Sequence, residues 1–182
     1  MARRKVIIDT DPGTDDLIAL LMALRSPSLD IVGITTVGGN ARLAHTTRNA
    51  LRILAYMGRT GVPVVAGASR PLRGRFTYAY DFHGPAGLTV RLPLPYTRPT
   101  PGRASDFIYR TLAASPGQVS ILALGPLTNL AHLLREHPDA NRLMGELVVM
   151  GGAVGVPGNV TPHAEFNVFN DPLAAQEVLA AG

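Results

Sequence analysis

The stretch VIIDTDPGTDD, residues 6–16, decides the fold of this chain. Three apolar residues predict a buried strand that ends at Asp9, and Pro12-Gly13 turn the chain. Thr14 is expected to cap a helix whose first turn holds Asp15 and Asp16. This order of strand, turn and helix opens a βαβ unit, in which ligands bind beyond the carboxyl end of the strand.

Four carboxylates crowd this turn, although the chain carries a net charge of +4. A helix N-terminus stabilises an acidic side chain by about 0.3–1 kcal/mol, which accounts for Asp15 and Asp16 only. Asp9 and Asp11 precede the turn, so their repulsion needs a cation or another positive partner. The cluster therefore favours a site for a hard metal ion such as Ca²⁺ or Mg²⁺ over helix capping alone.

The rest of the chain alternates short apolar runs with longer helical patterns. This rhythm predicts an α/β fold: a Rossmann-like, doubly wound, mostly parallel sheet flanked by helices. The expected strands lie near 4–9, 30–37, 63–66, 119–124 and 146–151. The expected helices lie near 14–25, 42–57, 103–114, 127–136 and 171–181. Loops that follow strands should converge on one edge of the sheet.

Two loops each contain one polar residue that is a candidate for contacting a ligand. Asn40 ends the loop TTVGGN and either points into the site or caps the following helix. His83 lies in the segment 67–101, a long stretch rich in Pro, Gly and Arg that is typical of a lid or binding loop. A loop histidine is usually just solvated, but in a lid it can touch substrate.

A third candidate segment, residues 158–172, concentrates amide and carboxylate side chains. Asn159 opens it, and Glu165 and Asn167 flank one aromatic residue. A polar loop would explain the asparagines alone. The alternation of Glu165 and Asn167 suits a polyhydroxylated ligand, because each group can bond a sugar hydroxyl.

Composition narrows the class of protein. The chain has 182 residues and no cysteine, which excludes disulfides and thiolate metal sites. Its basic residues are scattered, so we do not expect nucleic-acid binding. No apolar run is long enough to span a membrane, and the N-terminus does not read as a secretory signal. A cytoplasmic protein is the simplest interpretation.

Six motifs, taken together, resemble the inosine–uridine-preferring nucleoside hydrolase family. In chain order they are DTDPGTDD, VGGN, FHGPAGL, LGPLTN, MGG and GNVTPHAEFNVFNDPLAA. The resemblance implies an enzyme that uses Ca²⁺ to activate a water molecule and hydrolyses ribonucleosides to ribose and free base. It also implies that residues 1–182 form a nucleoside hydrolase α/β domain.

The resemblance assigns roles to individual residues. Asp11 would be a calcium ligand and the general base, Asp16 would hold the ion with both oxygens, and the carbonyl of Leu124 would be a further ligand. Asp9 would support the site without direct contact. Substrate would be bound by Asp15, Asn40, His83, Met150, Asn159, Glu165 and Asn167, with His83 near the base.

The chain departs from the family pattern in two ways. One residue more than usual separates Met150 from Asn159. Family members are also much longer, and their C-terminal part supplies another aspartate ligand and, in one group, a histidine that protonates the leaving base. We therefore expect that this C-terminal part is absent and that the chain alone is inactive or weakly active. A full-length form is expected to be a homo-oligomer.

The sequence leaves alternatives for the preferred base of the substrate and for the function itself. The chain lacks tryptophan, on which purine-specific members stack the base, so the inosine–uridine or pyrimidine groups are closer. VIIDTD also fits the start of haloacid-dehalogenase-like, Mg²⁺-dependent phosphohydrolases, but their later lysine is missing, since Lys5 is the only one. A non-catalytic remnant that binds ribose or nucleosides is the third possibility.

Overall fold

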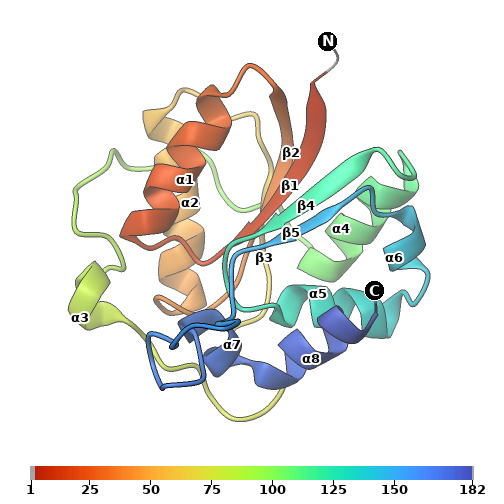
Figure 1. The fold of residues 1–182 in the computed structure, drawn as a ribbon. Coiled ribbons are helices and arrows are strands. Elements are labelled where there is room, and N and C mark those ends of the chain that lie inside the picture. Colours follow the sequence, from red (N-terminus) through yellow and green to blue (C-terminus); the bar gives the residue numbers. More distant parts are fainter. Residues whose placement is uncertain (1–2, 182) are drawn as a thin grey trace.

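A parallel five-stranded sheet forms the centre of the protein, which we describe over residues 3–181 from a computed structural model (Figure 1). The strand order is β3-β2-β1-β4-β5, and every neighbouring pair is parallel. The strands are β1 (Arg4–Thr10), β2 (Leu29–Thr36), β3 (Val64–Ala66), β4 (Val119–Ala123) and β5 (Leu147–Val149). The expected α/β, Rossmann-like class is confirmed.

Helices cover both faces of the sheet (Figure 1). They are α1 (Thr14–Arg25), α2 (Leu43–Tyr56), α3 (Tyr80–His83), α4 (Ala104–Ala113), α5 (Thr128–Glu136), α6 (Ala140–Leu143), α7 (Phe166–Asn170) and α8 (Pro172–Ala180). Successive residues of a strand point to opposite faces. Accordingly Val6 and Ile8 pack in the core beneath α1 and α2, whereas Ile7 packs with α4, α5 and α8.

The chain reverses its direction of travel across the sheet at β1. It runs from β1 outward to β2 and β3, and then returns to place β4 on the other side of β1. Loops leaving β1 and β4 therefore diverge at their carboxyl ends, which is where such sheets bind ligands. The two ends are joined directly, since Leu124 N–H donates to the Asp9 carbonyl at 2.7 Å.

The five expected strands and the five longer helices are all present, with ends shifted by a few residues. Three short helices, α3, α6 and α7, were not expected, because four or five residues are too few to show a helical period. The expectation that Thr14 caps α1 is wrong. Thr14 is the first helical residue, and the carboxylate of Asp16 accepts the free N–H of Gly13 at 3.1 Å instead.

The long segment 67–101 is tied to the carboxyl edge of the sheet by single hydrogen bonds. The N–H groups of Leu72 and Thr77 donate to the side chains of Asp171 and Asn170, at 2.9 and 2.8 Å. Ala79 N–H donates to the Asn40 carbonyl at 3.0 Å. These bonds bring the segment, with its short helix α3, across the ends of the strands.

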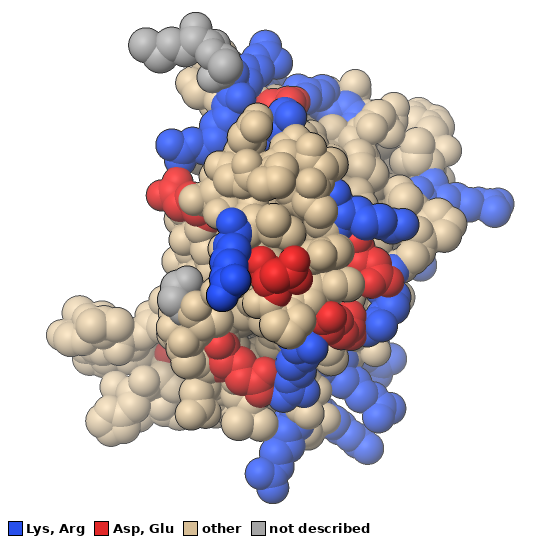
Figure 2. All heavy atoms as spheres, turned by 90° about the vertical axis from the view of Figure 1, so that its right-hand side faces the viewer, with Lys and Arg blue, Asp and Glu red and all other residues tan. Residues whose placement is uncertain are grey.

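Charges are interspersed over the face shown in Figure 2, where Lys and Arg lie among Asp and Glu. Among the surface ion pairs, Arg4 pairs with Glu146 at 2.6 Å, and Arg135 pairs with Glu177. Within residues 3–181, no helix combines the length and the apolarity that crossing a bilayer requires.

Burial in the core predicts which apolar residues stabilise the fold. Ile121 lies in β4 and is fully buried, so Ile121→Ala should lower the free energy of unfolding by about 2–5 kcal/mol. The matched control Ile18→Ala, at a side chain 57% exposed on α1, should change it by less than about 0.5 kcal/mol. Urea denaturation of both variants measures this. Equal losses would contradict the assigned core.

Candidate functional site

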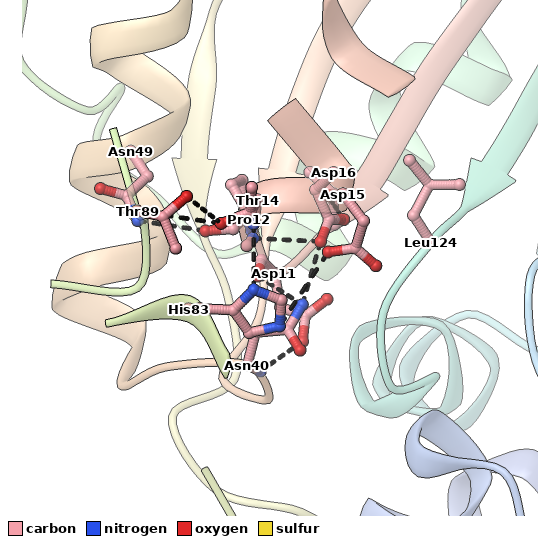
Figure 3. Close-up of polar contacts among 12 residues, drawn as sticks. Asp11, Pro12, Thr14, Asp15, Asp16, Asn40, Asn49, His83, Thr89 and Leu124 are labelled. Atoms are coloured by element: carbon pink, nitrogen blue, oxygen red, sulfur yellow. Dashed lines mark hydrogen bonds and ion pairs between the residues drawn. The ribbon is translucent and has the colours of Figure 1, made fainter. Parts of the chain in front are cut away.

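Two aspartates of the turn, Asp11 and Asp16, are buried and held by neighbouring donors (Figure 3). Asp11 follows β1, and its Oδ2 accepts the backbone N–H of Asn40 at 2.6 Å. Asp16 lies in the first turn of α1, where its Oδ2 accepts from Asn40 Nδ2 at 3.0 Å and its Oδ1 from Thr10 at 2.5 Å. The amide of Asn40 thus connects the two carboxylates.

Two glycines let other loops approach the Asp11 carboxylate. A Cβ on Gly125 would lie 2.6 Å from Asp11 Oδ1, and one on Gly39 would collide with Oδ2. Gly39 belongs to the VGGN loop after β2, and Gly125 to the LGPLTN loop after β4. Both glycines are therefore required for close approach rather than for an unusual turn.

The buried carboxylates are electrostatically costly. Burial, and then the charge of Asp16, raises the pKa of Asp11 well above its ordinary value. Burial raises the pKa of Asp9 and that of Asp16 to about 6. Asp11 Oδ1 and Asp9 Oδ2 are buried acceptors without a hydrogen-bond partner in the described part of the chain. Clustered carboxylates with a free acceptor fit a hard, oxygen-binding cation.

Asp9 is enclosed by protein donors. Its Oδ1 accepts from Thr35 Oγ1 at 2.5 Å and from Asn129 Nδ2 at 2.7 Å. Asn129 also donates to the Thr36 carbonyl at 3.1 Å and accepts from Ala68 N–H at 2.8 Å. Asn129 was missed by the sequence analysis, although it ends the LGPLTN motif. These contacts fit a supporting position for Asp9, which stays a prediction.

A second group of predicted residues meets where β4 and β5 end. Asn167 Nδ2 donates to the carbonyl of Leu124 at 2.9 Å and to that of Met150 at 3.1 Å. Glu165 is the N-cap of α7, where its Oε1 accepts from Asn167 N–H at 2.9 Å and its Oε2 from Gly152 N–H at 3.0 Å. Glu165 therefore fixes both α7 and the loop after β5.

His83 lies beside the aspartate turn at the end of α3 (Figure 3). Thr14 N–H donates to its Nδ1 at 3.1 Å, so the neutral ring carries its hydrogen on Nε2. Nε2 lies 4.0 Å from Asp15 Oδ1. The His83 side chain is 13% exposed and that of Asp15 is 74% exposed. The ring can therefore offer an N–H donor next to an accessible carboxylate.

A cavity of about 560 Å³ opens over these residues and collects most of the predicted site. The predicted residues that line it are Asp15, Asn40, His83, Leu124, Met150, Asn159, Glu165 and Asn167. Asp11 and Asp16 do not line the cavity, but both accept hydrogen bonds from Asn40, which does. Tyr78 and Phe82 also line the cavity and were missed. Their signal was the run of aromatic residues in the long segment 67–101.

A separate acidic group lies on α4 and at the end of α5. Oxygens of Asp106 and Glu136 and a nitrogen of His137 lie within 4.8 Å of one another and could hold a metal ion. Glu136, however, pairs with Arg103 and accepts from Ser105 Oγ at 2.7 Å. Because the Arg103 guanidinium already supplies positive charge to Glu136, we interpret this group as a surface ion-pair network. None of its residues lines the cavity.

Fold and site together define an α/β protein with buried carboxylates beneath a polar cavity at the carboxyl edge of a parallel sheet. The family model described as "Inosine-uridine preferring nucleoside hydrolase" matches residues 6–182, and the chain belongs to this family. The resemblance seen in the sequence is thereby confirmed.

Several relatives support the same family. The pyrimidine-specific ribonucleoside hydrolase RihA of Citrobacter koseri is 45% identical over 97% of this chain and 57% of its own length. The probable uridine nucleosidase 1 of Oryza sativa subsp. japonica is 43% identical over 99% of this chain and 56% of its own length. This chain therefore spans little more than half the length of the curated relatives that it matches.

Solved structures of nucleoside hydrolases have the same fold as this chain. The plant nucleoside hydrolase PpNRh1 superposes with a TM-score of 0.94 at 41% identity, covering 98% of this chain and 57% of that one. A purine-preferring ribonucleoside hydrolase from Gardnerella vaginalis gives 0.94 at 32% identity, covering 98% and 58%.

The raised pKa of Asp11 predicts a stability cost in calcium-free buffer. In the unfolded chain this carboxyl ionises near its ordinary pKa of 3.8, whereas in the folded chain its pKa is well above that value. The folded chain therefore binds the proton more tightly, and the free energy of unfolding falls as pH rises above 3.8. Asp11→Asn should therefore be more stable than wild type at pH 7 by roughly 0.5–2 kcal/mol. The difference should vanish near pH 4.

Thermal unfolding in the presence of a chelator, followed across pH, measures this difference. The exposed carboxylate Asp81 offers a control, because Asp81→Asn should show no such pH-dependent gain. A destabilised Asp11→Asn at pH 7 would contradict the electrostatic account of the site.

Proposed function

We propose that this chain carries the calcium and ribose site of a nucleoside hydrolase, which cleaves the N-glycosidic bond of ribonucleosides to give ribose and free base. The observation that carries the proposal is Asp11: a buried carboxylate with one free oxygen, behind a cavity lined by amide and carboxylate groups. Family membership supports the reaction class.

Asp11, both oxygens of Asp16 and the carbonyl of Leu124 are the proposed ligands of Ca²⁺. The carbonyl also accepts from Asn167 Nδ2 but keeps a second lone pair. Irregular oxygen sets of carboxylates and carbonyls suit Ca²⁺ better than Mg²⁺, which demands near-octahedral geometry. When bound, the ion would order the ribose hydroxyls and make a water molecule easier to deprotonate.

Asp11 is the proposed general base. Its Oδ1 is free of hydrogen-bond donors within the described residues, so no protein donor competes for a proton taken from water. Asp9 would act through position only, since Thr35 and Asn129 occupy one of its oxygens.

The polar lining is the proposed ribose pocket. Asp15, Asn40, Met150, Asn159, Glu165 and Asn167 surround the cavity. Cleavage of an N-glycosidic bond places positive charge on the ribose ring, and the carboxylates of Asp15 and Glu165 stabilise that charge. Because the charge is larger in the transition state than in the substrate, this stabilisation accelerates the reaction.

The base is proposed to lie toward His83, Tyr78 and Phe82. His83 offers Nε2–H as a donor, and the aromatic rings offer stacking surfaces. Relatives named as uridine nucleosidases and as a pyrimidine-specific hydrolase support a preference for pyrimidine nucleosides.

Asp11→Asn should lower ribose release from uridine by about 10²–10⁴-fold, because it removes the general base and a ligand charge. Reducing-sugar assays with Ca²⁺, at high protein concentration and over long incubations, measure the rates. Asp30→Asn, near the amino end of β2 and outside the cavity, should retain the wild-type rate. Unchanged turnover in Asp11→Asn would contradict the assigned base.

The 182-residue chain by itself should turn over far more slowly than the Citrobacter koseri RihA assayed beside it. The proposed direct ligands provide fewer than the 6–8 oxygens that Ca²⁺ prefers, which weakens metal binding. Uridine binding without turnover would instead favour a nucleoside-binding role. A rate equal to that of RihA would overturn the expectation of weak activity.

Uridine should be hydrolysed with a kcat/KM about tenfold or more above that of inosine. The relatives named as uridine nucleosidases and as a pyrimidine-specific hydrolase are the basis of this expectation. Parallel assays of the two nucleosides, at matched protein and Ca²⁺ concentrations, measure the ratio. A preference for inosine would contradict the proposed pyrimidine specificity.

The phosphohydrolase alternative is not supported. Lys5, the chain's only lysine, lies at the start of β1 and donates to Ser115 Oγ at 3.2 Å. It is thus at the opposite end of the strand from Asp9 and Asp11. Phosphate release from phosphomonoesters with Mg²⁺ is not expected.

A further inference from the structure

Asn49 joins two segments that are distant in sequence and that both reach the proposed site (Figure 3). It lies on α2 and is 1% exposed. Its Nδ2 donates to the carbonyl of Pro12 at 3.1 Å and to the carbonyl of Ala86 at 3.1 Å. Pro12 belongs to the aspartate turn, and Ala86 follows His83 by three residues. We call this pair of hydrogen bonds the Asn49 bridge.

The surroundings of the bridge are tightly packed. Gly87 adopts a positive φ of 77°, and a Cβ there would meet Ala41 Cβ at 2.8 Å and Asn49 Nδ2 at 3.1 Å. Nearby, Thr89 N–H donates to Thr14 Oγ1 at 3.3 Å. Residues 84–89 are thus pressed onto α2 and onto the beginning of α1.

His83 depends on this arrangement. The ring receives one backbone bond, from Thr14 N–H, and a Cβ on Gly13 would lie 2.9 Å from its Cε1. The chain before it is tied by Ala79 N–H to the Asn40 carbonyl, and the chain after it by the Asn49 bridge. His83 belongs to α3, a four-residue helix with no buried residue, which cannot hold the ring by itself.

We propose that Asn49 is a positioning residue, which holds His83 against the aspartate turn so that its Nε2–H faces the substrate cavity. The short amide side chain of Asn49 carries two hydrogens on one nitrogen, one for each carbonyl, whereas aspartate would offer none and serine one. The proposal rests on the proposed function for its consequence in nucleoside binding, but not for its structural content.

The structural content is tested by the ring nitrogens of His83. In the ¹⁵N NMR spectrum of wild type, Nδ1 and Nε2 should show the well-separated shifts of a fixed Nε2–H tautomer. In Asn49→Leu, both carbonyls lose their donor, the Thr14 bond loosens, and the two shifts should converge. His83→Ala identifies the signals.

Two further variants keep this test decisive. Gly87→Ala pushes the loop away from Asn49 without altering α2, and it should reproduce the convergence even if Asn49→Leu fails to fold. Thr47→Val is the matched control: it removes a buried 2.8 Å bond to Thr36 from the same helix, and it should leave His83 unchanged. Separate His83 shifts in a folded Asn49→Leu or in Gly87→Ala would overturn the proposal.

The functional consequence is tested by a double-mutant cycle on uridine affinity in the presence of Ca²⁺. Asn49→Leu should raise Kd by about tenfold, as expected for one mispositioned hydrogen-bond donor. In the His83→Ala background, the same substitution should change Kd by less than about twofold, because Asn49 acts through His83. Equal effects in both backgrounds would contradict positioning. If wild type binds no uridine, the proposed function fails, while the NMR result still decides the role of Asn49.

Discussion

The burial of three carboxylates at the carboxyl end of one central strand is the constraint on which the rest of the site depends. Asp9, Asp11 and Asp16 are buried, with at most 5% of each residue's surface exposed, and this burial raises the pKa of each carboxyl. Such a cluster persists only where donors or a cation offset the lost hydration. The neighbouring loops meet this demand in different ways.

The loops at the carboxyl edge of the sheet supply hydrogen-bond donors, or the space for them, that partly offset the lost hydration of the carboxylates. The loop after β2 brings the N–H and the amide of Asn40, and Gly39 lets it approach Asp11. The loop after β4 brings Gly125 and, from the start of α5, Asn129. What remains unsatisfied, Asp11 Oδ1 above all, is what a hard cation would satisfy. On the proposed assignment, the buried carboxylates lower the stability of the metal-free chain and preorganise a site for the cation.

Much of this could be predicted from the sequence, because its signals are local. Apolar runs bounded by Pro and Gly indicated the strands, and carboxylates placed directly after a strand indicated the site. Eight of the predicted residues meet at one cavity because parallel strands end at one edge. The short helices were missed, since they have no period. The cap of α1 was misassigned, because Asp16 serves both the helix end and the carboxylate cluster.

The contacts of Asn129 and Asn49 could not be read from the sequence, because their bonds join segments far apart in the chain, although Asn129 ends the LGPLTN motif. An asparagine within a helical pattern looks like an ordinary surface residue until the fold brings backbone carbonyls to it.

The central claim, that the aspartate turn is a calcium site, is tested most directly by calorimetric titration of the metal-free chain with Ca²⁺ at neutral pH. The account predicts saturable binding at one site, which is lost in Asp11→Asn. No binding to wild type, or equal binding to the variant, would contradict it.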